Sequence, residues 1–297
     1  PFSQEARDAF GVVLAAPTST SETIAVTEDI NFIFSTADFG TFSDPDESGL
    51  SAVIIKPLPG QGSLEYDADG NDSWQAVTTD QEITAANIES GRLRYVPASD
   101  VNGNGVTSFD FKVKDSADEV SSNYTVTVDV TAVNDAPVLD DTESPSLTAI
   151  AEDVADASNA GTAVSAIVVD GSITDADGSA AEAIYVTAVD ETNGSWEFST
   201  DSGSSWTAID FTGGNAGKGL LLDASDEIRF KPNADFNGSA DLTFGAWDKS
   251  TGSAGTYVDV SSTGADTAFS SATDTASIDV TAVNDAPVLD DTESPSL

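Results

Sequence analysis

Acidic side chains stand at matching positions in two stretches of this chain, and their types and spacing could do chemistry. Each stretch offers a Glu at the start of an expected strand, an Asp-x-Asp pair in a loop, an Asp at the end of a later strand, and then an Asn-Asp pair. Carboxylate and amide oxygens are hard ligands that suit calcium or magnesium. In chain order these candidate metal ligands are Glu28, Asp44, Asp46, Asp115, Asn134, Asp135, Glu152, Asp175, Asp177, Asp248, Asn284 and Asp285.

Asp and Asn are also common turn residues, because their side chains accept hydrogen bonds from nearby backbone amides. A single Asp-x-Asp pair is therefore more often a solvated turn than a metal site. Here the full ordered set occurs twice, and this repetition favours metal binding over simple turns.

Three residue types are absent from the chain, which has no Cys, no His and no Met. Without Cys there is no disulfide and no thiolate nucleophile, and without His there is no Ser-His-Asp triad or imidazole base. Zinc, copper and non-haem iron sites also lose their usual ligands. A pair of carboxylates could in principle hydrolyse a glycoside, but chance pairs are unavoidable among 52 acidic residues. We predict that the protein is not an enzyme.

The charge balance is strongly acidic. Against 52 acidic residues there are only 10 basic ones, so the formal net charge is −42. Such a surface repels nucleic acid and anionic membranes and attracts cations. The hydrophobic content of 39% is adequate for packed cores. No apolar run approaches the length of a membrane-spanning helix, so we expect no membrane-embedded segment.

An identical connector occurs twice and indicates an internal repeat. The sequence TAVNDAPVLDDTESPSL fills 131–147 and again 281–297. Further matching cues precede each copy in the same order, so we interpret the chain as two diverged copies of one unit. The expected organisation is a leader or upstream remnant (1–16), a first domain (17–136), a second domain with longer loops (137–286) and the start of a third repeat (287–297).

Alternation with a period of two dominates both copies. Tyr124, Val126, Val128 and Val130 alternate with polar residues, and Phe109 to Val113 and Leu242 to Ala246 follow the same pattern. Val, Thr, Ile and aromatic residues fill these runs, whereas Gly, Asn, Asp and Pro separate them. The only helical signal is about one turn within 80–91. The sequence predicts an all-β fold of two tandem Ig-like antiparallel β-sandwiches.

The second copy is longer because a Ser/Gly/Thr-rich segment, 249–275, separates its last two clear strands. Its composition favours a tolerated surface loop over a functional one. A separate stretch, NGSWEFSTDSGSSW (193–206), places Trp196, Phe198 and Trp206 near polar loops, where aromatic rings could stack on sugars. Because Trp196 and Phe198 are two residues apart, we expect them to share a core-facing side instead.

Four sequence segments resemble the cadherin-like tandem repeats of giant bacterial surface adhesins of the RTX type. They are VTAVNDAPVL, SDPD (43–46), TDADG (174–178) and DFNG (235–238). The resemblance extends over nearly all of 17–297. It implies an extracellular module at the bacterial cell surface that acts in adhesion or biofilm formation. It also implies calcium ions as cofactors, bound between successive repeats, and neighbouring repeats of the same chain as partners.

Carried over residue by residue, the resemblance implies one joint and two half-sites. The joint would draw on Glu28, Asn134, Asp135, Asp175, Asp177 and Asp248. Half-sites would be formed by Asp44, Asp46 and Asp115 at the front and by Glu152, Asn284 and Asp285 at the back. Cadherins also supply an Asp-Arg-Glu element that is missing here, and Asp100 stands near its place. The alternative function is a glycan- or protein-binding module that uses loops of the second domain.

Two sharper motifs fail on inspection. DADGNDSW (67–74) begins like an EF-hand loop, but Asp72 stands where the invariant Gly belongs and Thr78 where the closing Glu belongs. GGNAGKGLLLD (213–223) resembles one calcium β-roll repeat, and a single copy cannot build a roll.

Overall fold

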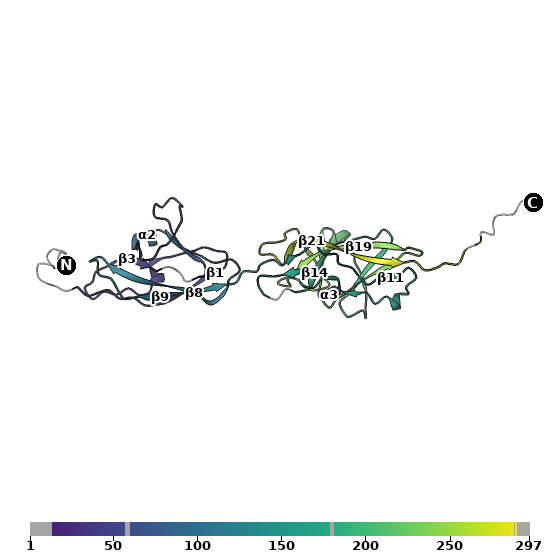
Figure 1. Ribbon diagram of the computed structural model, residues 1–297, viewed down its shortest axis with the longest axis horizontal. Coiled ribbons are helices and arrows are strands. Elements are labelled where there is room, and N and C mark those ends of the chain that lie inside the picture. Colours follow the sequence, from purple (N-terminus) through teal and green to yellow (C-terminus); the bar gives the residue numbers. More distant parts are fainter. Residues whose placement is uncertain (1–13, 57–59, 179–180, 288, 290–297) are drawn as a thin grey trace, which may run out of the picture. The chain divides into compact units, whose positions relative to one another are not determined.

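A computed structural model describes residues 14–56, 60–178, 181–287 and 289. Its contacts divide the chain into two compact units, with the division between Val133 and Asn134. We call them unit 1 and unit 2 (Figure 1). The division falls before the Asn-Asp pair, three residues ahead of the boundary expected at 136. Most of the expected leader (1–13) and most of the expected third repeat (288 and 290–297) lie outside the described residues.

Unit 1 consists of two sheets around one core. The first sheet has the strand order β1-β9-β8-β3-β6, and the second has the order β2-β7-β4-β5. The elements are β1 (Glu22–Thr27), β2 (Phe32–Ile33), the 3-10 helix η1 (Thr36–Phe39), β3 (Leu50–Ile55), β4 (Ser63–Tyr66), β5 (Gln75–Ala76), β6 (Gln81–Thr84), α2 (Ala85–Glu89), β7 (Leu93–Val96), β8 (Gly103–Asp115) and β9 (Tyr124–Thr131).

The predicted alternation is present in the two longest strands of unit 1. Val126, Val128 and Val130 of β9 are buried, and Phe109 and Phe111 of neighbouring β8 face the same core. The core also takes Leu64 of β4 and Tyr95 of β7, which belong to the other sheet, so the two sheets form a sandwich. All pairs are antiparallel except β1 and β9, which run parallel.

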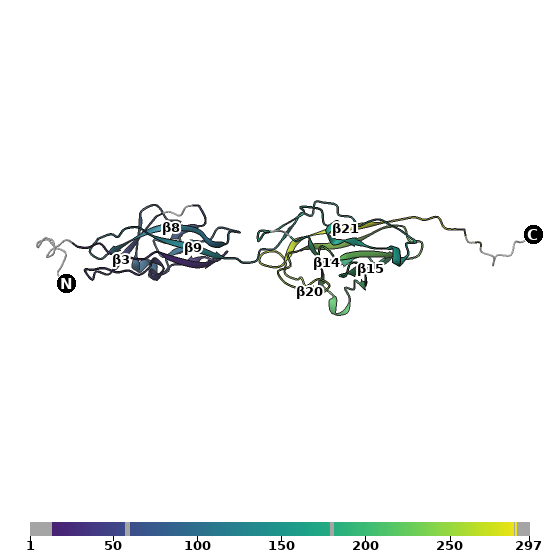
Figure 2. The same ribbon diagram turned by 90° about the horizontal axis from the view of Figure 1, so that it is seen from below.

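Unit 2 repeats this plan with extra strands (Figure 2). Its main sheet has the order β11-β21-β19-β14-β17-β20, its second sheet β12-β18-β15-β16, and a short ladder joins β10 and β13. The elements are β10 (Val138–Leu139), β11 (Ile150–Ala151), η2 (Asp156–Ser158), β12 (Thr162–Ala163), α3 (Val164–Ile167), β13 (Ile173–Thr174), β14 (Ala183–Val189), β15 (Gly194–Ser199), β16 (Thr207–Ala208), η3 (Gly213–Asn215), β17 (Lys218–Leu222), β18 (Glu227–Pro232), β19 (Gly238–Trp247), β20 (Tyr257–Asp259) and β21 (Phe269–Thr281).

The predicted all-β class and Ig-like antiparallel sandwich type are confirmed by these sheets. Each unit departs from a purely antiparallel arrangement at one edge of its main sheet. There β11 pairs parallel with β21, as β1 does with β9, and a parallel bridge joins Ser146 to Ser277. The one-turn helix expected within 80–91 is α2, and Thr84 caps it by accepting a hydrogen bond from the Asn87 amide.

The segment 249–275 is not the surface loop that its composition suggested. Part of it forms β20, which extends the main sheet by pairing with β17. The segment also covers the outer face of that sheet, where it closes a second hydrophobic cluster. Its buried members are Ala183, Tyr185, Leu221, Trp247, Ala268 and Phe269. The prediction failed because apolar residues on β14, β17 and β19 face away from the main core and need a cover.

The aromatic stretch 193–206 divides as predicted for two of its rings. Trp196 and Phe198 are buried on β15 in the main core of unit 2. Trp206 is only half-buried and lies outside that core.

Candidate metal-binding groups

Unit 1 brings three predicted ligands together at one end of its main sheet. We call Asp44, Asp46 and Asp115 the front group of unit 1. The Asp46 amide donates to Asp44 Oδ1 at 2.5 Å, and Asp115 ends β8 with Oδ1 accepting from the amides of Ala117 and Glu119, both at 2.8 Å. The Asp-x-Asp pair is therefore held by its own turn, and it is oriented toward the strand end.

The carboxylates of Asp44 and Asp115, at the centre of this group, lie next to each other. Burial raises the pKa of Asp115, and the neighbouring Asp44 carboxylate raises this pKa further. Asp115 is 1% exposed, and its Oδ2 atom has no hydrogen-bond donor. Asp44 Oδ2 is likewise buried without a donor. Two anionic oxygens in this state form a site that a cation would complete.

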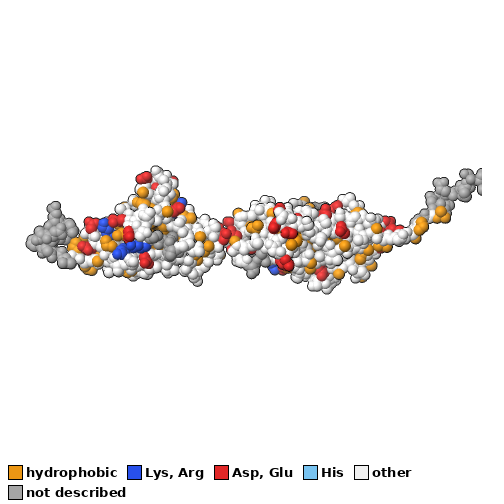
Figure 3. Space-filling model, in the orientation of Figure 1, with side chains coloured by type: hydrophobic (Ala, Val, Ile, Leu, Met, Phe, Trp, Pro, Cys, Tyr) orange, Lys and Arg blue, Asp and Glu red, His pale blue; other side chains and the backbone are white. Residues whose placement is uncertain are grey.

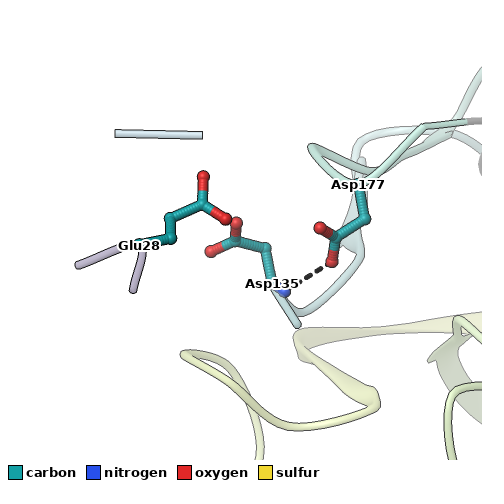
Figure 4. Close-up of side chains that lie close together, drawn as sticks. All are labelled: Glu28, Asp135 and Asp177. Atoms are coloured by element: carbon teal, nitrogen blue, oxygen red, sulfur yellow. Dashed lines mark hydrogen bonds between the residues drawn. The ribbon is translucent and has the colours of Figure 1, made fainter. Parts of the chain in front are cut away.

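The front group of unit 2 is Asp175, Asp177 and Asp248, and it has the same Asp-x-Asp turn and the same strand-end aspartate. The Asp177 amide donates to Asp175 Oδ1 at 2.9 Å, and Asp248 follows directly after β19. This group receives two further donors from the start of the unit. The Asn134 amide nitrogen Nδ2 donates to Asp248 Oδ2 at 2.9 Å, and the Asp135 backbone amide donates to Asp177 Oδ2 at 2.7 Å (Figure 4).

The Asn-Asp pair is therefore part of unit 2 and not a free connector. Besides the contacts to the front group, the Asn134 side chain donates to the carbonyl of Thr267, and the Ala136 amide donates to the carbonyl of Ala265. Five of the predicted ligands thus meet within unit 2. They are Asn134, Asp135, Asp175, Asp177 and Asp248.

At the other end of unit 1, Glu28 anchors what we call the rear group, Glu28, Asn102 and Val133. Glu28 extends the β1–β9 ladder, because its amide donates to the Thr131 carbonyl at 2.9 Å. Its side chain, drawn in Figure 4, is fully buried. Oε2 accepts from the Val133 amide at 3.2 Å and from Asn102 Nδ2 at 3.3 Å, whereas buried Oε1 has no donor.

The rear group of unit 2 is Glu152, Asn237, Val283 and Asp285. Glu152 Oε1 accepts from the Val283 amide at 2.5 Å, and Oε2 accepts from Asn237 Nδ2 at 3.2 Å. Partial desolvation raises the pKa of Asp285, and the carboxylates of Asp235, Asp153 and Glu152 raise it further. Asn284, the remaining predicted ligand here, is exposed and donates to the Asp285 carbonyl.

Front and rear groups lie at opposite ends of one strand in each unit. Asn102 precedes β8 and Asp115 ends it, just as Asn237 precedes β19 and Asp248 follows it. Unit 1's strand has 13 residues, which span about 40 Å at roughly 3.3 Å each. Within unit 1, therefore, Glu28 does not meet Asp44, Asp46 or Asp115.

The sequence reasoning missed Asn102, Asn237 and Asp235. Their common signal is Asp-x-Asn-Gly directly before a long strand, at 100–103 and 235–238. Both aspartates have positive φ, 57° at Asp100 and 58° at Asp235, and a Gly with positive φ ends each loop. This tight backbone turns the Asn side chain toward the rear Glu. Asp100 holds in unit 1 the place of Asp235, which acts on Asp285 in unit 2.

The rejected EF-hand-like loop has a structural role. Asp67 is buried, and its carboxylate accepts from the amides of Gly70, Asn71 and Asp72. These backbone hydrogen bonds lower the pKa of Asp67 against the opposing effect of burial, the largest single influence. The side chain thus organises its own turn.

The acidic side chains are not confined to these groups. Figure 3 shows them at many places across the visible face of each unit, with fewer basic side chains. Among the described residues, no helix has the length and hydropathy needed to cross a membrane.

Comparison with known families and curated proteins finds no match for this chain. Solved structures with a similar arrangement include a variant of the SrpA adhesin from Streptococcus sanguinis, at 17% identity over 66% of this chain and 93% of that one, with a TM-score of 0.24. DIP-gamma IG1+IG2 matches at 7% identity over 90% and 98%, with a TM-score of 0.30. Drosophila N-cadherin EC1-3 matches at 12% identity over 91% and 68%, with a TM-score of 0.23. The fold assignment rests on the sheets described above.

Proposed function

We propose that this chain is a calcium-rigidified spacer module of a large secreted bacterial adhesin of the cadherin-like RTX type. One observation carries the calcium-binding part of the proposal, and the resemblance of the repeats to adhesin sequences supports the rest. Among the described residues, four buried side-chain oxygens or nitrogens lack a hydrogen-bond partner, and three of them belong to predicted ligands. They are Glu28 Oε1, Asp44 Oδ2 and Asp115 Oδ2.

Buried polar atoms are rarely left without partners, and an ionised carboxylate is the most costly group to leave so. A bound calcium ion supplies the positive charge that such oxygens need. The front and rear groups offer carboxylate, amide and backbone oxygens in loops, which suits the larger and more flexible shell of calcium better than the octahedral shell of magnesium.

The joint is proposed from chain connectivity. Glu28 binds the amide of Val133, the last residue of unit 1, and Asn134 and Asp135 follow directly and are bonded to the front group of unit 2. A cation held by Glu28 together with Asp135 and Asp177 would tie the end of one unit to the start of the next. Without it, these carboxylates repel one another and the joint flexes.

In this role the protein acts outside the cell, at the bacterial surface, with calcium ions and neighbouring repeats as its partners. The front group of unit 1 and the rear group of unit 2 would each supply half of a further joint. The module would hold a distal binding domain away from the surface, and it would have no catalytic activity.

A calorimetric melt in chelator, in calcium and in magnesium tests the proposal. An ion bound only by the folded state stabilises by about 2.7 kcal/mol at one hundred times its dissociation constant. We expect millimolar calcium to raise the melting temperature clearly and magnesium to raise it less. Identical melts in chelator and in calcium would refute calcium binding.

Small-angle scattering of the Asp135→Ala variant tests the joint itself. No core residue is altered, so we expect the variant to stay folded but, in calcium, to give the broad distance distribution of the wild type in chelator. Exposed Asp141, six residues further along the same connector, provides the control variant Asp141→Ala, which should keep the wild-type profile. If Asp135→Ala also keeps it, Asp135 is only a turn residue.

A further inference from the structure

The fourth buried oxygen without a partner, Glu227 Oε2, lies away from the metal-binding groups, beside Trp206. The Glu227 residue lines a cavity of about 420 Å³ in unit 2. The side chains and backbone that define this cavity include Asp156, Asn159, Gly203, Trp206, Glu227 and Arg229.

Arg229 lines this cavity, and Glu197 already balances its charge. Its Nε and Nη2 atoms donate to Glu197 Oε2 at 2.8 and 2.5 Å, and Nη1 donates to the carbonyls of Asp156 and Asn159, both at 3.1 Å. The guanidinium stacks on Trp206 at 4.0 Å from the ring centroid. These contacts account for four of its five N–H groups and leave one on Nη2 for a ligand.

Unit 1 contains the same stacked set without the free acid. Arg94 pairs with Glu65 and stacks on Trp74 at 4.1 Å, so stacking alone is a structural feature of the fold. The residue two positions before the stacked arginine differs. In unit 1 it is Arg92, whose Nη1 donates to the Ala68 carbonyl and which packs beside Gly70.

In unit 2 that position is Glu227, which packs beside Gly203 in the same way. Nothing in the described structure donates to its Oε2. The terminal torsion of a glutamate is broad, so a small rotation turns this oxygen into the cavity. Unit 2 therefore has a feature that unit 1 lacks: the Glu227 carboxylate, an acceptor without a donor, lies beside the Trp206 ring and the cavity.

We propose that this cavity binds a neutral saccharide of one or two rings. Hydroxyl groups of the sugar donate to Glu227 and accept from the remaining Nη2–H of Arg229, while the ring packs against the indole of Trp206. The volume lies in the range of small-molecule sites. Glu197 already neutralises Arg229, so the unpaired Glu227 carboxylate gives the cavity a negative charge that disfavours an anionic sugar.

The test is a titration of the whole 297-residue chain, monitored by ligand-observed NMR. The neutral probes are the methyl glycosides of glucose, galactose, mannose and N-acetylglucosamine. N-acetylneuraminic acid is the anionic probe and glucosamine the cationic one. We expect saturable binding of at least one neutral probe at millimolar concentration, no tighter binding of glucosamine, and weaker binding of N-acetylneuraminic acid.

Substitutions locate the site. Glu227→Gln should weaken binding of the neutral probe about tenfold, equivalent to about 1.4 kcal/mol. Glu227→Arg, which installs the unit 1 residue, should abolish binding without disturbing the fold. Trp206→Ala should also abolish it, whereas the matched variant Trp74→Ala in unit 1 should leave it unchanged. No saturable binding of any neutral probe, a preference for a charged probe, or binding that survives Glu227→Arg would overturn the proposal.

Discussion

Unit 1 and unit 2 share a strand order but treat the outer face of the main sheet in opposite ways. On this face of unit 1, Lys114 forms an ion pair with Glu82. In unit 2, Trp247 occupies the position of Lys114, and Leu221 occupies the position of Glu82. The charged pair Lys114–Glu82 can face water, whereas the apolar side chains of Trp247 and Leu221 must be buried under other residues. The segment 249–275 supplies that cover, through β20 and the buried residues Ala268 and Phe269.

The front groups differ in a comparable way. Leu14 and Ala15 stand in unit 1 where Asn134 and Asp135 stand in unit 2, and the Ala15 amide donates to Asp46 Oδ2 as the Asp135 amide does to Asp177 Oδ2. The backbone contact is retained, but the side-chain donor is lost. As a result Asp248 Oδ2 has a partner in Asn134, whereas Asp115 Oδ2 has none.

The largest effect should come from the second hydrophobic cluster. Trp247→Ala removes a ring that is 2% exposed, and we expect it to lower the free energy of unfolding by about 3–5 kcal/mol. The matched variant Lys114→Ala in unit 1 removes two surface ion pairs, with Glu82 and Asp118, each worth about 0–1 kcal/mol. Urea unfolding of both variants at fixed calcium measures the difference. A loss below about 1 kcal/mol for Trp247→Ala would show that 249–275 is a loose loop after all.

The sequence predicted the sheets well and the metal-binding groups only in part. Strands such as Tyr124–Thr131 alternate cleanly because one face is core and the other is water. The alternation fails in GLLLD (219–223) and GAWD (245–248), because both faces of the sheet are buried there. Without an alternating pattern to indicate a second buried face, the composition of 249–275 led to the prediction of a surface loop. The Asp-x-Asp turns were recognisable because they are local. Asn102 reaches Glu28 from 74 residues away, and its Asp-x-Asn-Gly motif does not indicate which residue it will contact.

The second prediction concerns the two strand-end aspartates, whose isosteric replacement should have opposite effects in chelator. In Asp115→Asn an NH₂ group replaces Oδ2, the oxygen that has no hydrogen-bond donor. The substitution removes a buried negative charge and provides a donor for the neighbouring Asp44 carboxylate. We expect the free energy of unfolding to rise by about 1–3 kcal/mol. In Asp248→Asn the new NH₂ group must face either the Asn134 side-chain amide or the Ser250 backbone amide. Both are donors, so we expect a fall of similar size.

Thermal unfolding of both variants in chelator, compared with the wild type, gives the two signs. In calcium both variants lose a charged ligand, so both should respond less to the ion than the wild type does. If the two variants shift in the same direction in chelator, the missing Asn134 counterpart in unit 1 is not what leaves Asp115 unsatisfied.

The smallest effect should come from the rear glutamates, Glu28 and Glu152. In unit 1 one oxygen of Glu28 accepts both hydrogen bonds and the other has no donor, so Glu28→Gln keeps both bonds and removes a buried charge. In unit 2 each oxygen of Glu152 accepts one bond, so Glu152→Gln must place its NH₂ group against the Val283 amide or the Asn237 side chain. We expect Glu28→Gln to stabilise the protein in chelator by about 1 kcal/mol and Glu152→Gln to destabilise it by as much.

Thermal unfolding of both variants in chelator, compared with the wild type, measures these two effects. Adding calcium should reverse the gain in stability of Glu28→Gln, because the variant has lost an anionic ligand. A gain that persists in calcium would mean that Glu28 is a structural residue, with no part in holding the ion.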